Sequence, residues 1–305
     1  MTICHLRRLR RARWVPSVGA LCVAVLGLAV VASCARKGEP DDSPPRLQEP
    51  ASSAATPTTA SPSAAPIATA CPSDMVLAEG LYCPQLEQRC QTAPNQTAPA
   101  SGNTCQRYLP SRCLTAQKQL LRVCIDRYEW PNQLGQKPLV LVGFDEAQQL
   151  CESAGKRLCD EQEWSFACEG EHLLPYSYGY ERDPTRCVID RLANKPSERW
   201  ARYDECMDND RCREAFSEID QREPTGTFRG CVSPVGAHDM TGNVSEWVRV
   251  LGPKPGHATK GGYWGPGPDQ CRATTPAKKP LDAKGQAQEL SPELGFRCCR
   301  NASPG

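Results

Sequence analysis

The chain lacks the cysteine and histidine spacings of a zinc protein and the charge of a nucleic-acid binder. Sixteen of its 19 cysteines lie from Cys71 onward, yet no two of them have the spacing Cys-x-x-Cys, and only three histidines lie beyond residue 34. Zinc frameworks normally show such paired ligands, so none is expected. The net charge of +1 includes five arginines before residue 34, and without them it falls to about −4. Binding to phosphate backbones is therefore not expected as the main function.

The N-terminal apolar run is too short for a typical membrane-spanning helix. It extends from Val18 to Val31 after an arginine-rich segment, whereas a stable span takes about 20 apolar residues. The run instead predicts the core of a signal peptide. It ends Val-Ala-Ser before Cys34, which resembles a bacterial lipobox and implies a lipid on that cysteine. The alternative is an ordinary secretory signal that ends near a cysteine. We expect residues 1–33 to be removed and the protein to be anchored in the cell envelope, at the outer membrane.

Residues 34–70 lack the means to form a core. After Cys34 the segment is rich in Pro, Ala, Ser and Thr and contains no aromatic residue. A segment of this composition cannot bury enough apolar surface to fold. We expect it to be a tether, which at roughly 3 Å per residue reaches on the order of 100 Å when extended. The globular part is then residues 71–300.

The cysteine content points to an oxidising compartment. Nineteen cysteines in 305 residues are far more than a reduced cytosolic protein usually carries. The 16 from Cys71 onward are an even number, which favours a framework of disulfides. Cys206 and Cys212 are close together within a charged insert, and a local bond between them is one expectation.

Two helices and several short strands are expected in the globular part. An apolar stripe with helical spacing predicts a helix from near Asp145 to Gly155; its members are Ala147, Leu150, Cys151 and Ala154. Asp160 and Glu163 form a capping-box pattern, which predicts a second helix that closes at Gly170. Short strands are expected at 137–142, 242–250, 261–264 and 295–299. Few helices and many turns predict an α+β, loop-rich fold.

Four motifs in order resemble the formylglycine-generating enzyme (sulfatase-modifying factor) family. They are KRLCDEQEWSFA at 156–167, DMTGNVSEWV at 239–248, KGGYW at 260–264 and GFR at 295–297. Residues 75–80 also resemble the opening strand of the family. The resemblance covers residues 71–300 and implies the C-type-lectin-like α+β fold. It also implies a disulfide between Cys151 and Cys298, and the three motif tryptophans Trp164, Trp247 and Trp264 are expected in the core.

The copper chemistry of the family is not expected here. Its enzymes oxidise a sulfatase cysteine with copper held by two cysteines that follow the Gly-Gly-Ser motif with the spacing Cys-x4-Cys. The corresponding residues are Pro266 and Cys271, and Tyr263 replaces the serine. Proline offers no ligand to a soft metal ion. Cys271 is more readily interpreted as half of a disulfide than as a reactive thiol. The segment that includes Tyr263, Trp264, Pro266 and Cys271 occupies the family's substrate groove, so it is the candidate ligand surface.

The calcium motif of the family is kept. By resemblance, the ligands are Asp239, Gly242, Val244 and Glu246, with backbone carbonyls from the middle two. All are oxygen donors, which suit a hard cation. The alternative is that Asp239 and Glu246 only cap turns. The three histidines at 172, 238 and 257 show no metal spacing and are expected to be surface or loop residues.

Two functions from different classes remain open. The first is a non-catalytic surface lipoprotein whose domain binds a protein, peptide or glycan partner. The alternative is a divergent formylglycine-generating enzyme, or another cysteine-based oxidoreductase, centred on Cys271. The loss of a ligand at Pro266 and the bulk of Tyr263 favour the first.

Overall fold

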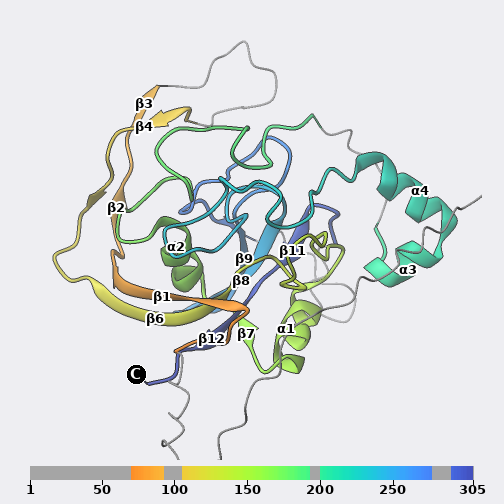
Figure 1. Cartoon of the computed structure of the whole chain (residues 1–305), viewed down its shortest axis with the longest axis horizontal. Coiled ribbons are helices and arrows are strands. Elements are labelled where there is room, and N and C mark those ends of the chain that lie inside the picture. Colours follow the sequence, from red (N-terminus) through yellow and green to blue (C-terminus); the bar gives the residue numbers. More distant parts are fainter. Residues whose placement is uncertain (1–69, 93–104, 193–199, 277–289, 305) are drawn as a thin grey trace, which may run out of the picture. The chain divides into compact units, whose positions relative to one another are not determined.

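The computed structural model describes residues 70–92, 105–192, 200–276 and 290–304 (Figure 1). Cys34 and the expected tether, apart from Ala70, lie outside these ranges. No helix in the described ranges is long and apolar enough to cross a membrane. The helices are α1 (Phe144–Ser153), α2 (Glu161–Glu169), α3 (Tyr203–Asp208) and α4 (Asp210–Ile219). The strands are β1 (Met75–Tyr82), β2 (Leu86–Glu87), β3 (Cys90–Thr92), β4 (Arg107–Tyr108), β5 (Arg112–Cys113), β6 (Gln119–Asp126), β7 (Arg157–Leu158), β8 (Ser245–Val250), β9 (Gly256–Lys260), β10 (Thr275–Pro276), β11 (Leu294–Phe296) and β12 (Cys298–Asn301).

Two four-stranded sheets organise the domain. The first has the order β1-β6-β12-β7, and its strands pair antiparallel. The second has the order β10-β9-β8-β11, in which β11 runs parallel to β8. Strands β11 and β12 are consecutive in the chain but belong to different sheets, with Arg297 between them. The C-terminal segment therefore joins the two sheets (Figure 1).

The two expected helices form where the sequence places them. In α1, Ala147 and Cys151 are buried, while Ala154 is exposed at the C-cap. Gly155 follows with φ 67°, a left-handed conformation that costs glycine little. In α2, the Asp160 backbone N–H donates to Glu163 Oε2 at 2.9 Å, which forms the predicted capping box.

Two of the expected strands are wrong. Residues 137–142 form no strand, and Leu141 within them has φ 56°, which interrupts an extended backbone. Residues 261–264 form a turn after β9, since Gly261 and Gly262 both have positive φ. The expected strand at 242–250 begins only at Ser245, and that at 295–299 is divided between β11 and β12. The opening strand is present as β1.

The core forms around the motif tryptophans and the disulfides. Trp164, Trp247 and Trp264 are each at most 1% exposed, which confirms their expected burial. The described residues contain eight disulfides: Cys71–Cys124, Cys83–Cys113, Cys90–Cys105, Cys151–Cys298, Cys159–Cys299, Cys168–Cys271, Cys187–Cys231 and Cys206–Cys212. They use all 16 cysteines from Cys71 onward. The set includes the pair implied by the resemblance, Cys151–Cys298, and the local pair Cys206–Cys212.

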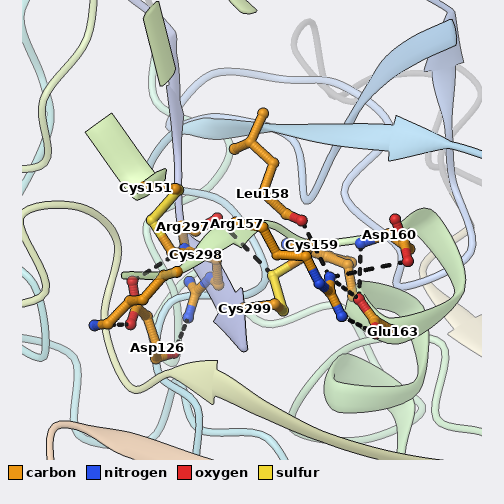
Figure 2. Close-up of a disulfide and its surroundings, with 12 residues drawn as sticks. Asp126, Cys151, Arg157, Leu158, Cys159, Asp160, Glu163, Arg297, Cys298 and Cys299 are labelled. Atoms are coloured by element: carbon orange, nitrogen blue, oxygen red, sulfur yellow. Dashed lines mark hydrogen bonds and ion pairs between the residues drawn. A yellow bond between two sulfur atoms is a disulfide. The ribbon is translucent and has the colours of Figure 1, made fainter. Parts of the chain in front are cut away.

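The adjacent cysteines Cys298 and Cys299 of β12 form disulfides on opposite faces of the strand. Successive side chains of a strand point to opposite faces. Cys298 accordingly packs with Cys151 of α1, and Cys299 packs in a different core cluster with Cys159. Figure 2 shows the two bonds on either side of the strand. The C-terminal strand is thus fixed to α1 and to the start of α2.

Candidate functional site

The candidate groove segment is packed against the domain. Trp264 is fully buried, whereas Tyr263 and Pro266 are partly exposed. A Cβ atom built on Gly265 would collide with the ring of Tyr263, and one on Gly267 would lie 3.6 Å from it. The tyrosine ring therefore lies over the Gly265–Gly267 loop. The structure confirms neither a ligand role nor a catalytic role for these residues, but it shows that the space above this loop is filled from within.

Cys271 has no free thiol in the structure. Its sulfur is bonded to Cys168 of α2, and both residues are 0% exposed. The backbone N–H of Cys271 donates to the carbonyl of Pro175 at 2.8 Å, which holds the segment in place. A copper site of the family's kind does not fit these residues, because one position is a disulfide sulfur and the other, Pro266, has no ligand atom.

The expected calcium ligands Asp239, Gly242 and Val244 lie in a tight turn before β8, and Glu246 lies within β8. Gly242 has φ 79°, and a Cβ there would collide with the Val188 carbonyl, so this close approach requires glycine. Its N–H donates to the carbonyl of Gly261 at 2.8 Å. Asp239 Oδ2 accepts from the N–H of Gly226 at 2.7 Å. These contacts fix the backbone of the turn.

Glu246 is held by a buried ion pair. Arg297 donates through Nε to Oε2 and through Nη2 to Oε1, each at 2.7 Å, and Trp164 Nε1 donates to Oε2 at 2.7 Å. Both side chains of the pair are 0% exposed. A carboxylate has about four lone-pair sites, so Oε1 keeps one that is not used by these bonds. This lone pair could accept one further contact, to a cation or to a hydrogen-bond donor.

The neighbourhood of the turn has more buried negative than positive charge. Glu129 is fully buried; burial, together with the nearby Asp239 and Glu246 carboxylates, raises the pKa of Glu129 well above its usual range. Burial also raises the pKa of Asp239 to about 6. Arg297 faces all three acids. Within the described ranges, no group of three or more His, Cys, Asp or Glu side chains is arranged to hold a metal. The donor chemistry thus fits calcium only with help from carbonyls such as those of Gly242 and Val244, and calcium stays a prediction.

The three histidines are not gathered in one place. The His238 ring lies beside that of Tyr128, with centroids 5.2 Å apart and the planes tilted, and burial lowers the pKa of His238. His257 stacks on Phe144 at 4.5 Å. The carbonyl of His172 accepts a hydrogen bond from the Tyr180 hydroxyl at 3.0 Å. These are packing and loop roles.

Sequence reasoning missed a buried arginine that connects the groove segment to a surface pocket. Arg182 bonds both oxygens of Asp190, through Nε at 2.8 Å and Nη2 at 2.9 Å, and its Nη1 bonds Asp269 of the groove segment. The other Asp269 oxygen has no hydrogen-bond partner among the described residues. Burial raises the pKa of Asp269 to about 6 despite the arginine. The aromatic run Tyr-Ser-Tyr-Gly-Tyr at 176–180 was the available signal in the sequence, because binding residues are found disproportionately on loops.

The pocket beside Arg182 has a volume of about 470 Å³. Residues 178–183 and Arg186 line it. Tyr178 stacks on Tyr176 at 5.8 Å, and the Arg186 guanidinium lies 5.9 Å from the centre of the Tyr178 ring. The pocket is therefore polar and has the aromatic residues Tyr178 and Tyr180 in its lining.

Comparisons with known proteins identify a family and a set of distant structural relatives. The family model described as sulfatase-modifying factor enzyme 1-like domain matches residues 103–302. No curated protein matches the sequence. Among solved structures, CarF is 14% identical, and the match covers 76% of this chain and 99% of CarF with a TM-score of 0.44. PvdO from Pseudomonas aeruginosa is 15% identical over 71% of this chain and 92% of its own, with a TM-score of 0.40. Treponema denticola variable protein 1 is 13% identical over 73% of this chain and 99% of its own, with a TM-score of 0.38.

Proposed function

The chain belongs to the family of sulfatase-modifying factor enzyme 1-like domains, and from that premise we propose that it is a non-catalytic binding module, displayed from the bacterial cell envelope by a lipid on Cys34. The observation that carries the proposal is the bond between Cys271 and Cys168. The family's oxidation chemistry needs thiolates that bind copper. Here one ligand position is a buried disulfide and the other is Pro266.

The filled loop supports the same conclusion. The ring of Tyr263 covers the backbone of Gly265 and Gly267, so a substrate cysteine would have to displace an aromatic side chain that is itself partly buried. The eight disulfides support a stable domain in an oxidising environment, which suits a surface protein. A rigid scaffold that carries loops and lacks catalytic ligands is well suited to binding.

The oxidoreductase alternative is tested directly. The purified full chain is loaded with copper and incubated with a cysteine-containing peptide from a sulfatase, and the products are measured by mass spectrometry. The peptide should remain unchanged. It should also remain unchanged with Cys168→Ala, which frees the thiol of Cys271 but leaves no second thiolate at Pro266. Formylglycine produced by the wild type above the level with Cys271→Ala would show that the protein is an enzyme.

The anchoring part of the proposal rests on the sequence before residue 70. Metabolic labelling with a fatty acid should label the wild type in a bacterial host and should leave Cys34→Ala unlabelled, because Cys34 ends the lipobox-like run. Label that persists in the variant would place the lipid elsewhere and refute the anchor assignment.

Calcium is part of the proposal as a structural ion. The support is the excess of buried carboxylate around Asp239 and Glu246 and the remaining lone pair on Glu246. A cation there would offset part of this negative charge. Its expected role is to stabilise the turn before β8, with no part in chemistry.

A further inference from the structure

The pocket formed by residues 178–183 and Arg186 is built on a rigid frame. Arg182, one of the residues that line it, is 6% exposed and is held by two carboxylates, Asp190 and Asp269. The backbone N–H of Arg182 donates to the carbonyl of Gln106 at 2.8 Å, and that of Tyr108 donates to Tyr180 at 2.9 Å. These bonds fix the loop to β4. A pocket with a fixed shape binds its ligand at a lower ordering cost.

A disulfide also stabilises the segment that supports the pocket. The disulfide Cys90–Cys105 joins β3 to the chain two positions before β4. The hydroxyl of Tyr176 donates to the carbonyl of Cys105 at 2.6 Å, so the aromatic wall is bonded to the stapled segment. Strand β4 also forms a bridge between Arg107 and Glu181. The wall of the pocket is therefore connected to the disulfide framework at several points.

The charges that line the pocket are balanced in pairs. The Glu181 carboxylate pairs with Arg107 at 2.5 Å, and Arg186 lies 3.7 Å from Asp183. Arg182 is neutralised by its two acids. An ionic ligand would gain little net attraction here, because each charge of the pocket already faces its opposite.

The same groups retain hydrogen-bonding capacity that suits hydroxyl groups. A guanidinium has five N–H donors and a carboxylate about four acceptor sites, while Arg186 and Glu181 are 54% and 62% exposed and make one ion pair each. A sugar hydroxyl donates and accepts at once, so it can use a neighbouring donor and acceptor together. These planar, charged groups form stronger hydrogen bonds than neutral ones.

The shape of the pocket also suits a ring-shaped ligand. A Cβ atom built on Gly179 would meet nothing within 4 Å, so the space above this residue is open. Tyr178 and Tyr180 lie on either side of it in the chain and line the pocket. Aromatic side chains provide apolar surface against which the C–H face of a sugar packs. The volume of about 470 Å³ lies within the range of small-molecule sites.

We propose that this pocket binds one unit of a neutral saccharide, with Arg186 and Glu181 as the hydrogen-bonding residues and the tyrosine wall as the packing surface. The proposal rests on the proposed function, since it names the ligand class of a binding module. It differs from the family's substrate groove in place and chemistry: the pocket is lined by residues 178–183 and Arg186, not by the 263–271 segment.

The test uses the purified full chain and saturation-transfer NMR with glucose, galactose, mannose and N-acetylglucosamine as probes. At least one of them should bind with a Kd of about 1 mM, and Arg186→Ala should weaken that binding by about tenfold. Glu181→Gln should also weaken it. The matched control is Arg213→Ala, because Arg213 is 50% exposed and pairs with an acid three positions away, as Arg186 does. This control should bind like the wild type.

Three results would overturn the proposal. They are the absence of binding to all four sugars by the wild type, binding that is unchanged in both pocket variants, and displacement of the sugar by inorganic phosphate. None of these results concerns formylglycine, so failure of the sugar proposal and failure of the non-catalytic function are read from separate assays.

Discussion

Removal of one of the two disulfides on β12 should lower the unfolding free energy by much less than the length of the loop closed by that bond suggests. Taken alone, Cys151–Cys298 closes a loop with a sequence separation of 147, for which the chain-entropy model gives about 5 kcal/mol. The neighbouring bond Cys159–Cys299 holds almost the same ends together. Cys151 and Cys159 are eight positions apart, and the other two cysteines are adjacent. The bond therefore closes an effective loop of only about ten residues, worth about 3 kcal/mol.

Removal of the remaining disulfide should then lower the unfolding free energy by more than removal of the first. With both bonds removed, the shortest remaining link between these ends runs through Cys168–Cys271. By the same model, loss of the second bond opens an effective loop of nearly 40 residues and costs about 4 kcal/mol. Guanidinium unfolding of the Cys151→Ala/Cys298→Ala protein, of the Cys159→Ala/Cys299→Ala protein and of the quadruple variant measures these values.

The critical result is how the losses of unfolding free energy in the three variants compare in size. Each paired variant should lose about 3 kcal/mol, and the quadruple variant about 7 kcal/mol. A loss of about 5 kcal/mol from either pair alone would mean that the two bonds act independently. It would refute the reasoning that adjacent cysteines on one strand share a loop.

Three further changes test other parts of the structure. Calcium at 100 times its Kd should stabilise the protein by about 2.7 kcal/mol, which is seen as a higher Tm, and Asp239→Ala or Glu246→Ala should remove this increment because each deletes an oxygen ligand. Equal melting curves with and without calcium would refute the site. Asp160→Ala should cost about 1 to 2 kcal/mol in chemical denaturation, because it removes a capping box and the bond from Arg249 Nε at 2.9 Å; no loss would show that α2 does not need its cap. Gly242→Ala should cost about 3 kcal/mol or more, since its Cβ would collide with the Val188 carbonyl in a left-handed turn, and a loss below 1 kcal/mol would indicate that the turn can relax.

The parts of the fold that local sequence determines were predictable. The helix α1 follows from an apolar stripe, and α2 from a capping box, because both signals act within a few residues. The motif order identified the family, and the family match and the C-type-lectin-like α+β fold are confirmed. The strands were less predictable. Residues 261–264 read as extended, but two consecutive glycines with positive φ turn the chain there.

At the site, the missing copper ligand could be predicted from the sequence, but most of the side-chain contacts could not. Pro266 in place of a ligand is visible in the sequence alone. The partner of Cys271 is not, because 16 cysteines allow very many pairings and sequence does not decide between them. The connection from Arg182 to Asp269 spans 87 positions, so only the folded chain brings the two together. The pocket that we assign to a saccharide depends on that connection.

Asp269 gives the protein a pH dependence of definite sign. Its pKa rises on folding from 3.8 to about 6, because burial outweighs the pairing with Arg182 and one carboxylate oxygen lacks a partner among the described residues. The pKa of Arg182 is also raised, since its hydrogen bonds to Asp190 and the attraction of Asp269 outweigh burial. The ion pair with Arg182 therefore reduces the free-energy cost of burying the Asp269 carboxylate without removing it.

Between pH 4 and 6 the native state holds a proton on Asp269 that the unfolded state has lost. Unfolding free energy then falls as pH rises through this window, and the penalty is complete above about pH 6. A shift of about 2 units corresponds to at most about 3 kcal/mol. Urea unfolding of wild type and Asp269→Asn at pH 5, 6 and 7 isolates the effect, since the amide cannot ionise. The unfolding free energy of the variant should increase relative to that of the wild type as pH rises, whatever the absolute stability of the variant. A difference that stays constant, or that grows in favour of the wild type with rising pH, would mean that Arg182 dominates and that Asp269 is an ordinary buried ion-pair partner.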